Sequence, residues 1–192
     1  FSQGGGESKD VWWHDPEYIE PISPFNDSGK WKIVEENRKW FMKQIHKSSY
    51  TIDICNALSR YNSALNPSSR DNQFLKLWST LELLTHTARN KYDVTIRRAS
   101  FIWKDPNYHY QILNNLRYLR NAAVHESSDI TDGELSVYQL KRYVEQLLFF
   151  HIRNCTRHKS MSESVEMLDL PAEMPAIRKK LSLLKRAVRF RS

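Results

Sequence analysis

Glycine is scarce in this chain of 192 residues. There are five glycines, three of them consecutive at positions 4–6, so Gly29 and Gly133 are the only two in the rest of the sequence. This scarcity excludes a Walker-type phosphate loop, a dinucleotide-binding fingerprint and a series of tight glycine hairpins, because each depends on glycine at fixed positions. A function must therefore be sought in other side-chain patterns.

Cysteines and long apolar runs are also few. Cys55 and Cys155 form no CxxC pattern and are too few for a disulfide framework. Both lie in helical apolar patterns, so we expect two core residues of a protein in the reducing cytoplasm. No apolar run approaches the roughly 20 residues that span a bilayer, and no signal peptide is recognisable. We therefore expect a cytoplasmic protein with no membrane partner.

Positive charge is concentrated at the end of the sequence. Residues 1–175 contain 22 basic and 22 acidic residues, whereas residues 176–192 contain seven basic residues and no acidic one. The net charge of +7 therefore belongs to this last segment. The main part of the chain is not a general nucleic-acid-binding surface, but the basic end is a candidate for one.

Proline spacing and apolar periodicity predict an all-α fold. Prolines at positions 24, 67, 106 and 171 bound three long proline-free blocks, as helices require. Apolar residues recur at helical spacing over 31–48, 50–64, 68–87, 92–103, 108–124, 131 to about 157, and 176–192. The first two segments are either one helix or two helices joined at Ser48–Ser49. The prediction is a compact bundle of five to seven helices.

Individual residues are expected to begin these helices. Ser68 or Ser69 is placed to cap the third segment, and Thr131 with Glu134 forms a capping box for the longest one. Residues 159–174 are expected to form a loop. The core-facing positions expected in the longest helix are Leu135, Tyr138, Val144, Leu147, Leu148 and Ile152.

The chain divides into three expected parts. Residues 1–30 are aromatic and rich in proline, which favours either an extended strap, packed on the body or joined to an upstream domain, or a flexible linker. Residues 31–157 make up the helical domain. Residues 158–192 comprise the loop and a basic amphipathic helix. The apolar stripe of that helix consists of Ile177, Leu181, Leu184 and Val188.

No pattern of metal ligands or of an activated nucleophile is present. The seven histidines form no HxH or HExxH pattern, and the chain has no GxSxG elbow. His151 and His158 are seven residues apart, but no acid or thiol beside them completes a ligand set. We therefore expect no metal and no cofactor.

The pattern Arg-Asn-x-x-x-His occurs twice, at 120–125 and at 153–158. In a helix, Asn121 and His125 share a face, and Arg120 is about 140° around from His125 and roughly 7.5 Å along the axis. Two alanines inside the first copy allow another chain to approach closely, and the helical pattern breaks directly after its histidine. These features favour the first copy.

Arginine, asparagine and histidine together suit the cleavage of RNA by its own 2′-hydroxyl. That reaction needs a base, an acid and a cation for the charge on phosphorus, and histidine and arginine supply these functions. One histidine per chain is short of an acid–base pair, which a two-fold dimer with both His125 residues in one cleft would supply. The alternative is structural, with Arg120 and His125 capping a carbonyl or contacting Glu126.

Two segments together resemble the HEPN superfamily. They are LRYLRNAAVH at 116–125 and, on an earlier helix, FLKLWSTLELL at 74–84. The spacing of Phe74, Trp78 and Glu82, followed by RNxxxH, is most similar to the Apea-like HEPN branch.

The resemblance covers roughly residues 31–157. It implies a compact helical bundle that dimerises and cuts RNA without metal at a composite cleft, often as the effector domain of a defence or toxin system with an upstream domain or a partner subunit. It places Arg120 and His125 in the catalytic positions, Asn121 in the polar position after the arginine, and Glu82 near the site in support.

Two other functions stay open on the sequence. The bundle is alternatively a non-catalytic module for dimerisation or partner docking. The chain is alternatively a nucleic-acid-binding module that acts through its basic tail, with Lys185, Arg186 and Arg189 as RNA contacts. The tail helix itself either docks on its own bundle through the apolar stripe or stays free to bind RNA, a membrane or a protein.

Overall fold

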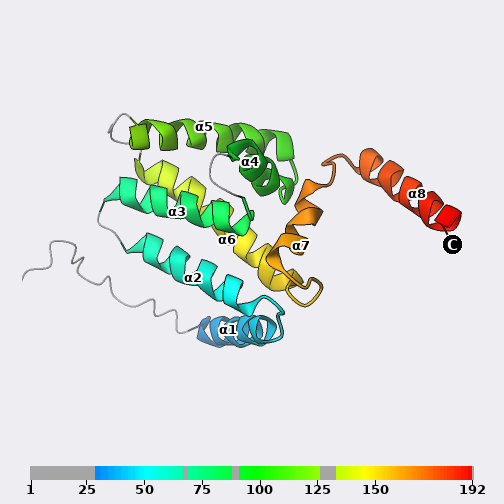
Figure 1. The fold of residues 1–192 in the computed structure, drawn as a ribbon. Coiled ribbons are helices and arrows are strands. Elements are labelled where there is room, and N and C mark those ends of the chain that lie inside the picture. The colour runs from blue at the N-terminus through cyan, green and yellow to red at the C-terminus, as the bar shows by residue number, and fades with distance from the viewer. Residues whose placement is uncertain (1–28, 67–68, 88–90, 126–132, 192) are drawn as a thin grey trace, which may run out of the picture.

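The computed structural model describes residues 29–66, 69–87, 91–125 and 133–191, with the side chain of His125 outside this part. The described residues form eight α-helices and one short 3₁₀ helix, without any strand (Figure 1). The helices are α1 (Trp31–His46), α2 (Thr51–Leu65), α3 (Arg70–Leu84), α4 (Tyr92–Phe101), α5 (Pro106–His125), α6 (Gly133–Asn154), α7 (Met161–Glu166), η1 (Met167–Asp169) and α8 (Met174–Arg191). The all-α prediction is confirmed, and the number of helices exceeds the expected five to seven.

Helices α3 and α6 form the centre of the bundle. Helix α3 contacts α2, α4, α5 and α6, and Figure 1 shows it between α2 and α5. Its apolar stripe faces the core at Phe74, Leu77, Trp78, Leu81 and Leu84, which are at most 2% exposed. Their spacing follows one face of a helix, in agreement with the helical periodicity of residues 68–87.

Local hydrogen bonds explain where the first three helices begin and end. The hydroxyl of Thr51 donates to the carbonyls of Ile45 (2.7 Å) and Ser48 (2.9 Å), so the chain turns there and α1 and α2 are two helices. Ser69 caps α3, since its Oγ accepts a hydrogen bond from the backbone N–H of Asn72. The expected cap at Thr131 and residues 1–28 of the expected strap at 1–30 lie outside the described residues.

The core-facing positions of α6 are only partly those expected. Leu135 and Tyr138 are 56% and 55% exposed, whereas Val137 and Leu140 are buried. The buried face follows positions 137, 140, 144, 147 and 151, and the two wrongly predicted residues lie off this face. Cys155 is buried as expected, but Cys55 is exposed, because α2 turns Ile54 and Ala57 inward instead.

The prediction of a loop at 159–174 is wrong, because α7 and η1 occupy residues 161–169. Ser160 caps α7 by accepting from the N–H of Glu163 (3.1 Å), whose carboxylate accepts from the N–H of Lys159 (2.7 Å). Met161, Val165 and Leu168 are nearly inaccessible to solvent. The short helix is therefore held by burial of one apolar side.

Helix α8 extends away from the bundle (Figure 1). None of its described residues is buried, and Leu181, Leu184 and Val188 of its apolar stripe are 51%, 56% and 68% exposed. The tail helix therefore does not dock on its own bundle through this stripe. None of the described helices is long and apolar enough to cross a bilayer.

Candidate active site

The first Arg-Asn-x-x-x-His motif occupies the last turns of α5. Burial of Leu113 and Leu116 fixes the helix on the bundle. Arg120 and Asn121 are half-buried, and the helix continues without a break to His125, its last residue. The three predicted catalytic residues therefore lie on one helical segment with the spacing that the motif requires.

Arg120 contacts both its motif neighbour and a ring from another helix. One terminal N–H group donates to Oδ1 of Asn121 (3.2 Å), and the guanidinium lies 5.1 Å from the ring centroid of Tyr92 at the start of α4. Stacking on an aromatic face restrains the guanidinium while leaving its charge in place. The arrangement thus holds a cation beside the polar residue of the motif.

A second contact joins the same two helices. Arg117, one turn before the motif, donates to the carboxylate of Asp93 at 2.7 Å and lies over the ring of Tyr118. Helices α4 and α5 are joined by a short turn and are therefore antiparallel, which brings the start of α4 to the later turns of α5. This topology places Tyr92 next to Arg120.

The Phe74, Trp78 and Glu82 series forms a chain of contacts along α3. The rings of Phe74 and Trp78 are stacked with centroids 6.5 Å apart, and Nε1 of Trp78 donates to Oε1 of Glu82 at 3.0 Å. Trp78 is 2% exposed, so its N–H needs an acceptor inside the protein, and Glu82 supplies it. Glu82 is thus held at the edge of the core by a specific partner.

Trp78 and Tyr92 link Glu82 to the motif on α5. The two rings are tilted against each other with centroids 6.3 Å apart, and Tyr92 in turn carries Arg120 on its face. The structure therefore brings the predicted acidic and basic elements into one neighbourhood through two aromatic rings. The sequence alone does not single out Tyr92, because its place beside Arg120 follows from the antiparallel pairing of α4 and α5.

The second copy of the motif has a different geometry. Helix α6 ends at Asn154, so the histidine of that copy is not on the same helix as its arginine and asparagine. Arg153 lies over the ring of Phe149, and the Asn154 amide donates to the carbonyl of Phe150 (2.8 Å). Arg153 and Asn154 therefore make these contacts within the last turns of α6.

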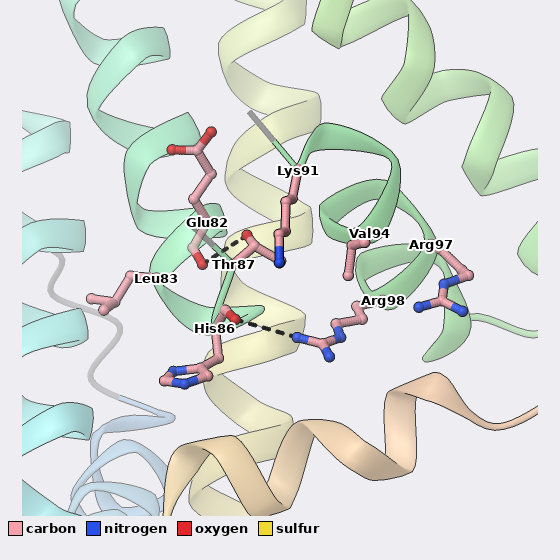
Figure 2. Close-up of a pocket in the computed structure, with 8 residues that line it drawn as sticks. All are labelled: Glu82, Leu83, His86, Thr87, Lys91, Val94, Arg97 and Arg98. Carbon is pink, nitrogen blue, oxygen red and sulfur yellow. Dashed lines mark hydrogen bonds between the residues drawn. The ribbon is translucent and has the colours of Figure 1, made fainter. Parts of the chain in front are cut away.

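A cavity of about 580 Å³ lies beside this site, between the end of α3 and α4 (Figure 2). Glu82 forms part of its wall. The other lining residues are Leu83, His86, Thr87, Lys91, Val94, Arg97 and Arg98. The wall is thus mainly basic and polar, with one carboxylate.

The proposed RNA contacts of the tail lie apart from the motif. Lys185, Arg186 and Arg189 are exposed on α8. In Figure 1, α8 extends from one end of the bundle, and the last turn of α5 lies at the other. Within one chain, the structure does not bring the tail to Arg120.

No metal-binding cluster is evident in the part of the chain that the structure describes, where no three His, Cys, Asp or Glu side chains are grouped to hold an ion. No protein-family model, curated protein or solved structure matches the chain. Its own geometry defines an all-α protein with an Arg-Asn pair on the last turns of α5, supported by aromatic residues of α3 and α4.

Proposed function

We propose that this protein is a metal-independent endoribonuclease of the HEPN type that cleaves RNA through its 2′-hydroxyl at a composite dimer cleft. The observation that carries the proposal is the placement of Arg120, which touches Asn121 and is joined through Tyr92 and Trp78 to Glu82. This physical connection between the two sequence elements that carry the resemblance supports the proposal.

The reaction has two proton transfers and one charge to stabilise. The 2′-oxygen attacks phosphorus as its proton passes to a neutral His125, and the bond from phosphorus to the 5′-oxygen breaks as a protonated histidine donates to that oxygen. The products are a 2′,3′-cyclic phosphate and a 5′-hydroxyl. Arg120 binds the non-bridging oxygens with its N–H groups, and Asn121 orients the phosphate or the histidine.

Two copies of the chain would supply the acid and the base. Each chain offers one His125, and the second copy would bring its own to the same cleft. Tyr118, two residues before the motif, and Val124, within it, are 58% and 45% exposed on α5. Apolar side chains at this place suit contact with another subunit.

The biological setting proposed from the resemblance is a defence or toxin system. The chain would act there as an effector domain, with RNA as its substrate and an upstream domain or a partner subunit that controls it.

The reaction is tested with RNA oligonucleotides of defined chemistry. Wild-type protein is expected to cut an all-ribose strand in the presence of EDTA and to leave a 2′,3′-cyclic phosphate and a 5′-hydroxyl. A strand with 2′-O-methyl groups throughout lacks the attacking hydroxyl and is expected to stay intact. Cleavage of the methylated strand, or loss of activity in EDTA, would refute the proposed mechanism.

A second candidate function rests on α8. This helix exposes its apolar stripe together with seven basic residues, and no acidic residue accompanies them from position 176 onward. Such a surface suits a non-catalytic module that binds nucleic acid or docks a partner through the tail. In that case the tail binds RNA and His125 is irrelevant to every activity of the chain.

A further inference from the structure

The cavity beside Glu82 is lined by basic side chains, and not all of them take part in ion pairs within the fold. Arg98 is committed to the structure, because its guanidinium binds both carboxylate oxygens of Asp169 (2.9 and 2.6 Å) and the carbonyls of Thr85 and His86. Lys91, in contrast, makes no ion pair with any described residue, and Figure 2 shows its ammonium group directed to the same region as Thr87.

Arg97 and His86 complete the basic wall. Arg97 shares the Asp169 carboxylate with Arg98 through a contact of 2.8 Å, and its side chain is 55% exposed. His86 follows the end of α3 with a positive φ of 48°, so the chain turns there and the imidazole is exposed at the rim. Lys91, Arg97 and His86 all line one open cavity, and Glu82 is the only carboxylate among its described lining residues.

The position of the cavity connects the candidate active site with the basic tail. Glu82 belongs both to the cavity and to the contact with Trp78, and Lys91 precedes Tyr92, which carries Arg120. On the other side, Asp169 binds Arg97 and also lies within the electrostatic reach of Lys180 on α8. The cavity thus lies between the catalytic motif and the start of the tail.

We infer that this cavity binds a phosphate-bearing nucleotide of the RNA strand on its path from the cleaved bond to α8, with Lys91 as the principal phosphate contact and Arg97 as the second. This inference rests on the proposed function, since it identifies where the substrate is held outside the reacting atoms. The volume suits one nucleotide unit, since small-molecule sites typically enclose about 300–1,000 Å³. Leu83 and Val94 provide apolar surface for a base or ribose.

The test measures binding of single-stranded 2′-O-methyl RNA, which the protein should not cut, by fluorescence anisotropy over a range of salt concentrations. Lys91→Gln is expected to weaken binding about fivefold to tenfold and to lower the slope of log K against log salt by about 0.7, the value for one phosphate on a single strand. Lys76→Gln is the matched control, because Lys76 is an exposed lysine of α3 outside this cavity. It is expected to bind as the wild type does.

Binding of adenosine monophosphate tests whether the cavity recognises part of an RNA strand or a free nucleotide. The cavity is expected to bind the mononucleotide far more weakly than the RNA, with amide chemical-shift changes at Thr87 and Val94 that Lys91→Gln abolishes. An unchanged affinity and salt slope in Lys91→Gln would overturn the inference, and so would a mononucleotide affinity equal to that of RNA. If wild-type protein fails to cut all-ribose RNA while Lys91→Gln still weakens binding, the cavity site stands and only the ribonuclease function falls.

Discussion

His151 is fixed in its neutral form by the residues that surround it. It is fully buried, and its Nε2–H donates to the carbonyl of Leu84 (2.7 Å) while Nδ1 accepts from the hydroxyl of Ser164 (3.0 Å). Burial lowers the pKa of His151 to about 4, although the hydrogen bond to the Leu84 carbonyl acts in the opposite direction. The residue therefore joins α6, α3 and α7 as a structural element and is unsuited to proton transfer at neutral pH.

The first prediction follows from this lowered pKa. Between about pH 6.5 and pH 4 the unfolded chain binds a proton at His151 that the folded protein does not bind. The contribution of His151 to the free energy of unfolding is therefore complete above this interval. It falls by on the order of 3 kcal/mol as the pH decreases through the interval. His151→Gln retains a donor for the Leu84 carbonyl but cannot titrate, so its stability should decrease less steeply over the same interval.

Urea unfolding of both proteins at a series of pH values measures the difference. Asp169 does not confuse the comparison, because the hydrogen bond and charge of Arg98 hold the pKa of Asp169 below its usual range, so its contribution is lost only at still lower pH. Equal acid slopes in wild type and His151→Gln would contradict the structural role given to the histidine.

Residues of the candidate site were only partly predictable from the sequence. The spacing of Arg120, Asn121 and His125 on one helix is a local property, so the motif could be read directly. The role of Tyr92 depends on the antiparallel pairing of α4 and α5, and a single sequence does not display such a pairwise contact. The cavity around Lys91 needs the turn at the end of α3 and was not predicted.

At the level of the helices, the ion pair of Arg98 with Asp169 fastens η1 to α4 and to the end of α3. The Arg98 side chain is 15% exposed, and it also satisfies carbonyls at the end of α3. Arg98→Ala should lower the free energy of unfolding by about 2–3 kcal/mol, because the carbonyls of Thr85 and His86 lose this donor in a partly buried site and Asp169 keeps only its contact with Arg97.

Arg38→Ala provides the matched control for this second prediction. Arg38 makes the same two-pronged contact with Glu35 (2.7 and 2.8 Å), but its side chain is 62% exposed on α1. Its removal should change the free energy of unfolding far less than Arg98→Ala does, because solvent screens an exposed ion pair. Similar effects of the two substitutions in urea unfolding would show that the Arg98 contact does not fasten η1.

The third prediction concerns α8. Because its apolar stripe is exposed, Leu181→Asp should leave the free energy of unfolding within about 0.5 kcal/mol of the wild type. Replacement of Lys185, Arg186 and Arg189 by glutamine should weaken RNA binding and reduce its salt slope by about 0.7 for each phosphate that the tail no longer binds. A clear decrease in the stability of Leu181→Asp would show that α8 docks on the bundle in solution, and an unchanged salt slope would remove the tail from the RNA site.

Among the helices, the sequence predicted α3 but not α7, and the difference lies in their length and apolar content. The apolar stripe of α3 runs from Phe74 to Leu84, about three turns on one face, so periodicity identifies it. Helix α7 has six residues, too few to display a period, and its sequence MSESVE is mostly polar. Burial of Met161 and Val165 against the rest of the fold stabilises it, and that packing is a tertiary effect.

For the whole molecule, the composite site makes activity depend on dimerisation. The fourth prediction is that co-refolding wild type with His125→Ala reduces RNA cleavage in proportion to the square of the wild-type fraction, since only dimers of two wild-type chains carry both histidines. Analytical ultracentrifugation of the mixture should show the same dimer as the wild type. A linear decrease in activity, or a fully active monomer, would contradict the composite cleft.

The most direct test of the ribonuclease assignment is single-turnover cleavage of all-ribose RNA by His125→Ala, Arg120→Ala and His158→Ala. Proton transfer and stabilisation of the phosphorane charge are each worth about a hundredfold or more, so the first two variants should be slower by at least that factor while remaining folded. His158→Ala, from the second copy of the motif, should cut at the wild-type rate. Undiminished cleavage by both His125→Ala and Arg120→Ala would contradict the assignment.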